Sequence, residues 1–187
     1  LDAYEKVSAN FEKLKSAMRS ILDMREAWGS RILMNLTLIA LTVGERLSLD
    51  ERSLTALRLG MNLYDLGLMK IPRTIRVKRE ELSQKERETL RGHTNVGYAL
   101  ISPMGLEDRI TKTVRSHHEH FDGTGYPDGL AGSEIPIEAR IVSVVDAFRA
   151  LMSEGPYRRT FSLAEARAEI EAGAGTRFDP AVVAAFG

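Results

Sequence analysis

Apolar residues recur at the spacing of α-helices along most of the 187-residue chain, whereas the alternating pattern of β-strands is nearly absent. The longest apolar run, ILMNLTLIALTV (32–43), is shorter than the roughly 20 residues that a bilayer-spanning helix needs. We interpret this run as a buried helix. The sequence therefore predicts an all-α fold with no membrane span.

Apolar periodicity and capping signals give the approximate limits of the helices. After the N-terminal segment, helices are predicted at about 30–46, 51–64, 84–101, 106–119 and 138–153. A further helix opens at Ser162, and a short last one begins near Pro180. Capping boxes are expected at Ser48 with Glu51, Ser83 with Glu86 and Ser162 with Glu165. The glycines and prolines of FDGTGYPDGLAGSEIP (121–136) exclude a continuous helix there.

The first residues carry a heptad stripe, in which apolar side chains follow at alternating spacings of three and four: Tyr4, Val7, Phe11, Leu14, Met18 and Ile21. Such a stripe indicates either an amphipathic helix packed on its own domain or a dimerising, signal-relaying helix. The chain starts at Leu1 rather than Met, so we expect a fragment of a longer protein, and this position favours the dimerising helix. We predict a helical lead over 1–46 and a second unit over 47–187.

Charge and cysteine content narrow the classes of partner. The formal net charge is zero, which disfavours nucleic acid polymers and anionic membranes as partners, although a small anion could bind a local basic site. The chain has no cysteine, which excludes disulfides and thiolate metal ligands. No signal peptide is visible, and we expect a cytoplasmic protein.

Candidate metal ligands are concentrated around HHEHFDGTGYPDG (117–129), where two adjacent histidines, His117 and His118, precede a glycine-rich turn. Imidazole is the commonest metal-ligating side chain. His93 lies within a predicted helix, and Asp65 and Asp146 lie in apolar helical runs, where an unpaired carboxylate is costly to bury. Two alternatives stay open for the carboxylates: a helix cap for Asp65 and a buried salt bridge for Asp146.

These segments resemble the HD-GYP domain family, bacterial phosphodiesterases that hydrolyse cyclic di-GMP. The similarity is carried by HHEHFDGTGYPDGLAGSEIPIEARIVSVVDAF (117–148), PYR (156–158) and FDP (178–180), with YDLGLMKIP (64–72) and HTNVG (93–97) upstream. It extends from about Leu47 to Phe186. The resemblance implies an HD-type helical bundle with a GYP loop extension.

The resemblance also implies which residues form the site. The metal-ligand positions correspond to Asp65, His93, His117, His118 and Asp146, and the first four would complete the site of one divalent ion. Iron or manganese is the implied metal, and zinc suits the same ligand types.

The GYP turn is complete in this chain, as Gly125, Tyr126 and Pro127. Gly123, Gly125 and Gly129 of the loop can take positive φ, and Pro127 stiffens the turn. The resemblance implies that the loop borders the site, where it would bind ligand, and that it contacts diguanylate cyclase domains. Arg158 and Arg159 are candidate phosphate contacts, because a guanidinium fork matches phosphate geometry. The alternatives without a binding role are that the loop only caps the helix ending at His118, and that Arg158 and Arg159 are solvated surface charges.

Several positions depart from the family pattern. The family has histidines where this chain has Tyr64 and, one helix upstream, Ile32; a third-metal glutamate corresponds to Trp28. A family lysine, arginine and acidic residue are replaced by Leu68, Gly155 and Arg149. A neutral phenol is a poor metal ligand, because its pKa near 10 keeps it protonated. One half of the metal centre is therefore expected to be intact and the other half to be lost.

Three hypotheses follow. The first is a degenerate HD-GYP domain that binds one metal ion, hydrolyses little or no cyclic di-GMP and acts as a binding or regulatory module. The second is an active phosphodiesterase with a reduced metal centre, in which Asp65 would take part in catalysis. The third is a homodimeric relay in which the N-terminal helix transmits a signal.

Overall fold

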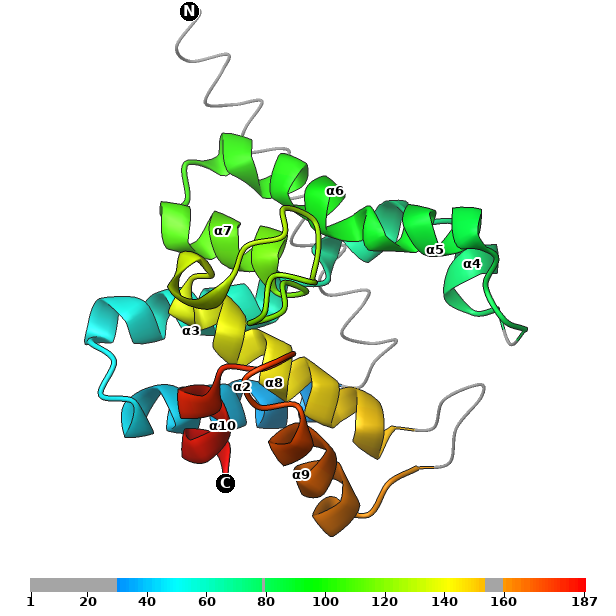
Figure 1. Cartoon of the computed structure of the whole chain (residues 1–187). Helices are drawn as coiled ribbons and strands as arrows, with labels where there is room; N and C mark the ends of the chain where they lie inside the picture. Colours follow the sequence, from blue (N-terminus) through cyan, green and yellow to red (C-terminus); the bar gives the residue numbers. More distant parts are fainter. Residues whose placement is uncertain (1–29, 79, 154–159) are drawn as a thin grey trace, which may run out of the picture.

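The structure, a computed structural model, describes residues 30–78, 80–153 and 160–187 (Figure 1). Helices dominate these residues, and the only β pairing within them is two isolated bridges, Asp122 with Ala131 and Ala174 with Phe178. The predicted all-α class is confirmed. The heptad helix and the positions Trp28, Gly155, Arg158 and Arg159 lie outside the described residues.

The helices follow one another as a bundle with a protruding arm (Figure 1). The α-helices are α2 (Ser30–Arg46), α3 (Glu51–Leu63), α4 (Arg73–Arg76), α5 (Gln84–Arg91), α6 (His93–Ile101), α7 (Asp108–Ser116), α8 (Ile137–Met152), α9 (Leu163–Ala172) and α10 (Pro180–Phe186). Three short 3₁₀ helices lie between them: η1 (Leu66–Lys70), η2 (Ser102–Met104) and η3 (Gly132–Glu134).

Two of the three predicted capping boxes are confirmed, at the starts of α5 and α9. The box predicted at Ser48 and Glu51 is wrong. Asp50 caps α3 instead, because its carboxylate accepts a hydrogen bond of 2.8 Å from the backbone N–H of Ser53. Ser48 has a φ of 55°, which is not the extended conformation that an N-cap residue adopts.

The helix predicted over 84–101 is two helices, α5 and α6, which meet at Gly92. Glycine is a poor residue for a helix interior, and here it separates two helical axes. The break makes His93 the first residue of α6 rather than a mid-helix residue. The arm formed by α4 and α5 extends from the bundle on one side of this junction (Figure 1).

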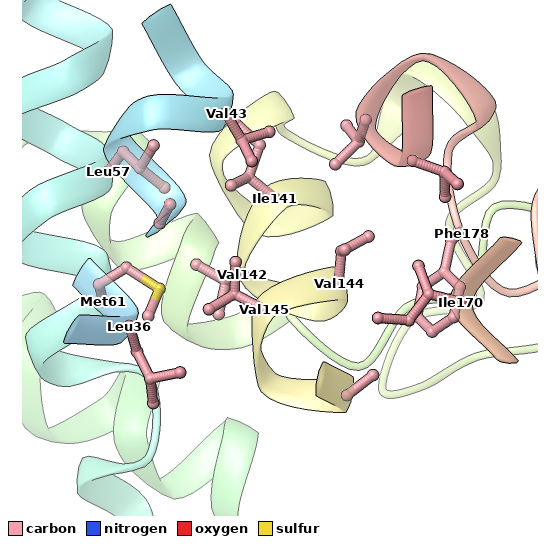
Figure 2. Packing of buried hydrophobic residues seen from close by; sticks show 14 of the residues in the cluster. Leu36, Val43, Leu57, Met61, Ile141, Val142, Val144, Val145, Ile170 and Phe178 are labelled. Carbon is pink, nitrogen blue, oxygen red and sulfur yellow. The ribbon is translucent and has the colours of Figure 1, made fainter. Parts of the chain in front are cut away.

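Helix α8 is the centre of the main hydrophobic core. Figure 2 shows Val142 and Val145 on the side of α8 that faces α2 and α3, and Val144 on the side that faces Ile170 and Phe178. A helix with buried residues on both sides must be apolar around most of its circumference, and IVSVV (141–145) has that composition. The core thereby fixes the position of α8.

Helix α2 contributes Leu36, Ala40 and Val43 to the same core, against α3 and α8. The part of the predicted lead that is described therefore packs on the rest of the domain. The division between residues 46 and 47 stays a prediction. None of the described helices is long and apolar enough to cross a bilayer.

Candidate metal centre

His93 and His117 face each other in the interior, with their Nε2 atoms 3.3 Å apart. The Nδ1 atom of His93 lies 2.7 Å from the Leu90 carbonyl oxygen, and that of His117 lies 2.9 Å from the Val114 carbonyl oxygen. A carbonyl oxygen can only accept, so each Nδ1 carries the hydrogen and donates. In the neutral rings the two Nε2 lone pairs then point into the same space.

Both rings are neutral near pH 7. Burial lowers the pKa of His93 below its ordinary value, and burial together with the neighbouring His93 lowers the pKa of His117 to about 4. Two neutral rings therefore have no proton to share between their Nε2 atoms. A cation that accepts both lone pairs fits this arrangement, whereas a hydrogen bond does not.

His118 completes the group of imidazoles. One nitrogen from each of His93, His117 and His118 lies within 4.8 Å of the others, as in the ligand set of a metal ion. Burial, and then the neighbouring His117, lowers the pKa of His118 well below its ordinary value. Three neutral imidazoles from two helix ends therefore converge.

Asp65 lies at the side of this group. Its Oδ1 atom is 3.6 Å from Nε2 of His93 and 4.0 Å from Nε2 of His117. It precedes η1, but its side chain makes no capping hydrogen bond, so the alternative of a helix cap finds no support. Burial, and then the neighbouring carboxylate of Asp146, raises the pKa of Asp65. A nearby cation would favour the ionised carboxylate.

Gly67 brings Asp65 close to the histidines. A Cβ atom on Gly67 would lie only 1.9 Å from the His93 carbonyl oxygen and 2.6 Å from the Gly97 backbone nitrogen. The backbone of η1 therefore touches that of α6, and the buried Leu66 packs with Ile101 and Val114 beneath this contact. Sequence analysis did not identify Gly67, although its place two residues after Asp65 was a usable signal.

Asp146 is bound by protein donors. Its Oδ1 accepts from the Tyr64 hydroxyl at 3.0 Å, from Arg149 Nε at 3.0 Å and from Arg149 Nη2 at 2.7 Å. This is the buried salt bridge that the sequence left open as an alternative to metal ligation. Burial, and then the carboxylates of Asp65 and Asp146, raises the pKa of Tyr64 well above its usual range, so the phenol stays protonated and donates.

Two further departures from the family pattern, Leu68 and Ile32, lie on described helices. Leu68 lies within η1, three residues after Asp65, where it offers no charge to the site. Ile32 lies within α2. The structure thus places an arginine–tyrosine–aspartate cluster next to the imidazole ligands, because the ring of Tyr64 contacts that of His117 with centroids 5.1 Å apart.

The GYP loop packs directly on the metal-ligand candidates. The ring of Tyr126 stacks on that of His118, with centroids 4.9 Å apart and an interplanar angle of 22°. The Tyr126 N–H donates to the His118 carbonyl oxygen at 3.1 Å, so the loop also caps the end of the helical segment. The Tyr126–Pro127 peptide bond is cis.

The glycines of the loop serve two purposes. Gly123 and Gly129 have φ angles of 82° and 69° and use this freedom, whereas Gly125 does not have a positive φ. Its role is a close approach instead, because a Cβ atom there would lie 2.2 Å from the backbone nitrogen of His120 and 2.5 Å from the Cα of Glu119.

Glu119 and Arg115 anchor the loop, and sequence analysis missed both. The buried Glu119 carboxylate accepts from the N–H groups of Asp128 at 2.7 Å and Leu130 at 3.1 Å. Arg115 donates two hydrogen bonds of 2.7 Å to the Asp128 carboxylate. The acidic residue between the histidines of HHEH was the available signal for Glu119.

An all-helical domain that gathers histidines and an aspartate from separate helices has the architecture of a helical metal-binding domain. Comparison with known sequences specifies the class: the family model described as HD domain matches residues 16–182. The chain belongs to the HD domain family.

Relatives within this family confirm the predicted resemblance to HD-GYP proteins. The chain is 35% identical over 175 residues to the cyclic di-GMP phosphodiesterase response regulator RpfG of Xanthomonas campestris, covering 91% of this chain and 46% of RpfG. It is 36% identical over 151 residues to a cyclic di-GMP phosphodiesterase of Thermotoga maritima, covering 77% of this chain and 40% of that protein. The chain thus spans less than half the length of these relatives.

A solved structure shows the same fold. The cyclic GMP-AMP-specific phosphodiesterase V-cGAP3 of Vibrio cholerae superimposes with a TM-score of 0.67 at 22% sequence identity, over 93% of this chain and 47% of that one. This likeness supports the helical HD architecture.

Proposed function

We propose that the domain binds one divalent metal ion through Asp65, His93, His117 and His118. The observation that carries this proposal is the convergence of the Nε2 lone pairs of His93 and His117 at 3.3 Å, with both Nδ1 atoms held by backbone carbonyls. Iron and manganese suit this mixed imidazole and carboxylate set, and so does zinc. A bound ion would act as a Lewis acid toward a phosphate oxygen or a water molecule.

The ligand that we propose is a cyclic dinucleotide, with cyclic di-GMP as the first choice. The relatives named above are described as acting on cyclic di-GMP or on cyclic GMP-AMP. Tyr126 offers an aromatic surface beside the imidazole group, and the Arg91 guanidinium lies 5.0 Å from its ring centroid. An aromatic ring and a guanidinium suit a base and a phosphate, respectively.

We propose that hydrolysis by this domain is weak or absent and that it acts mainly as a binding or regulatory module. Two metal ions about 3.5–4 Å apart are the usual arrangement for hydrolysis of a phosphodiester at such sites. The residues around Asp146 fit a second ion poorly, because Tyr64 and Arg149 already bind its Oδ1 atom and the positive guanidinium lies beside the carboxylate. The specific observation that favours an active enzyme is the intact group around His117 beneath a complete GYP loop.

Two partners belong to the same proposal. The GYP loop is held in one conformation by Glu119 and Arg115, which suits a contact surface for a diguanylate cyclase domain. The second partner would be another copy of this chain. A homodimer formed through the N-terminal heptad helix would allow one signal to reach both copies of the domain. Both proposals concern a longer protein of which this domain would be a part, as in the relatives named above.

The test combines metal analysis and turnover on one sample. Protein purified without chelator would be analysed for metal per chain by mass spectrometry and then assayed for hydrolysis of cyclic di-GMP. We expect about one ion per chain and little or no turnover. About two ions with rapid turnover would establish the active enzyme instead, and the absence of any metal would overturn the proposed centre.

A further inference from the structure

We propose that Arg149 is a built-in cation that takes the place of a second metal ion beside Asp65 and Asp146. This inference rests on the single-ion centre proposed above, and it concerns the Tyr64–Asp146–Arg149 cluster beside that centre. It assigns to Arg149 a positioning role: its guanidinium compensates the Asp146 carboxylate and keeps that carboxylate from binding metal.

Asp65 and Asp146 are two neighbouring carboxylates that are both largely withdrawn from solvent, and Asp146 is only 13% exposed. Two neighbouring carboxylates in such a place need compensation, because an unpaired buried charge is strongly destabilising. Arg149, whose side chain is 19% exposed, lies one helical turn after Asp146 on α8 and supplies a positive charge at 2.7 Å. A guanidinium keeps its charge at every accessible pH.

Three donors, the Tyr64 hydroxyl and two nitrogens of Arg149, converge on one atom, Oδ1 of Asp146, at 2.7–3.0 Å. A metal ion that used this oxygen would have to displace the Tyr64 hydroxyl and both Arg149 donors. It would also come close to a fixed positive charge, which repels it. The cluster thus disfavours a cation, because Oδ1 is occupied by donors and the guanidinium charge lies beside the carboxylate.

Tyr64 is the C-cap residue that follows α3, and its side chain points at Asp146, since the phenol reaches that carboxylate. A histidine at 64, with Arg149 shortened to an uncharged side chain, would present an imidazole and two carboxylates to the same space. Three such ligands are enough to bind a divalent ion when water completes the coordination.

The experiment compares the wild type with the double variant Tyr64→His/Arg149→Met and with a control, Arg52→Met. Arg52 also forms an ion pair, with Glu107 at 2.8 Å, but on the exposed surface. Each protein would be loaded with excess Mn²⁺ and freed of unbound ions by gel filtration. Manganese per chain and the electron paramagnetic resonance spectrum would then be measured. The spectrum distinguishes an isolated Mn²⁺ from an exchange-coupled pair.

We expect one Mn²⁺ with an isolated-ion spectrum in the wild type and in Arg52→Met, and two coupled ions in the double variant. Two ions in the wild type would overturn the inference while leaving the imidazole centre intact. A folded double variant that still binds one ion would also overturn it. If the wild type binds no ion, the proposed centre fails; a gained ion in the double variant would then still support the role of Arg149, and no gain would overturn it.

A second variant covers the case in which the double variant does not fold. Arg149→Gln removes the charge and retains a hydrogen-bond donor on a shorter side chain. Because its Asp146 carboxylate lacks a cation, added Mn²⁺ should raise its unfolding temperature by more than it raises that of the wild type. Equal increases in the two proteins would contradict the inference.

Discussion

His117 is fully buried, yet it is a polar residue whose Nε2 faces another nitrogen rather than a donor. Its Nδ1–H is committed to the Val114 carbonyl, so packing and hydrogen bonding fix both the ring orientation and the tautomer. This is the arrangement by which proteins orient an imidazole for metal binding.

Replacement of His117 tests its proposed role as a ligand. His117→Ala should weaken Mn²⁺ binding by more than about 100-fold, because loss of a ligand costs more than loss of a group that only orients one. Competition with a chromophoric chelator measures the affinity. The matched control is His120→Ala, since His120 bonds to Thr124 in the loop and is outside the imidazole group. Equal affinities for the two variants would contradict the assignment.

Tyr64→Phe isolates the hydroxyl that donates to Asp146. The ring is 4% exposed, so Phe fits the same space and only the hydrogen bond at 3.0 Å is lost. We expect the free energy of unfolding to fall by about 1 kcal/mol or somewhat more, because the acceptor is a charged carboxylate. Urea unfolding of the metal-free protein measures it. Tyr98→Phe, at a ring that lies beneath Arg115, provides the comparison.

At the scale of elements, the contact between η1 and α6 determines where Asp65 lies. Gly67→Ala should reduce the free energy of unfolding by about 1–3 kcal/mol, because the added methyl group overlaps the His93 backbone. It should also weaken Mn²⁺ binding, since the displacement separates Asp65 from His93. Gly187→Ala is the control at the last residue of the sequence given, where an added Cβ atom would be no closer than 3.4 Å to its nearest neighbour. Unchanged metal affinity in Gly67→Ala would argue against Asp65 as a ligand.

The loop anchored by Glu119 yields a separate prediction. Glu119→Ala removes the acceptor for the N–H groups of Asp128 and Leu130. Hydrogen exchange at these two amides should become faster, while exchange in the core helix α8 changes little. Exchange followed by mass spectrometry on loop peptides checks this. Glu88→Ala, on the arm, should leave loop exchange unchanged; a loop that stays protected without Glu119 would show that other contacts suffice.

At the scale of the whole molecule, metal binding should add to global stability. A ligand that binds only the folded state stabilises it by about 2.7 kcal/mol at a concentration 100 times its dissociation constant. We therefore expect Mn²⁺ to raise the denaturation midpoint of the wild type and chelation to reverse the increase. In His117→Ala the midpoint should be nearly insensitive to Mn²⁺. A wild type that is equally insensitive would contradict a folded-state metal site.

Local signals predicted the helical class well, because periodicity, caps and breakers act within a few residues of one another. They failed where two signals competed, as at Ser48 and Asp50, and where one glycine divided a periodic run, as at Gly92. The pairing among Tyr64, Asp146 and Arg149 joins residues 82 positions apart, so it depends on tertiary packing. The sequence could offer a salt bridge as one alternative for Asp146 but could not choose the partner.

The junction at Gly92 has a mechanical consequence. The Leu90 carbonyl oxygen, which accepts the Nδ1–H of His93, belongs to α5, whereas His93 itself begins α6. The arm of α4 and α5 extends from the bundle at this junction (Figure 1). Because the carbonyl that fixes the tautomer of His93 belongs to the arm, the hydrogen position on this imidazole depends on how α5 is placed relative to α6.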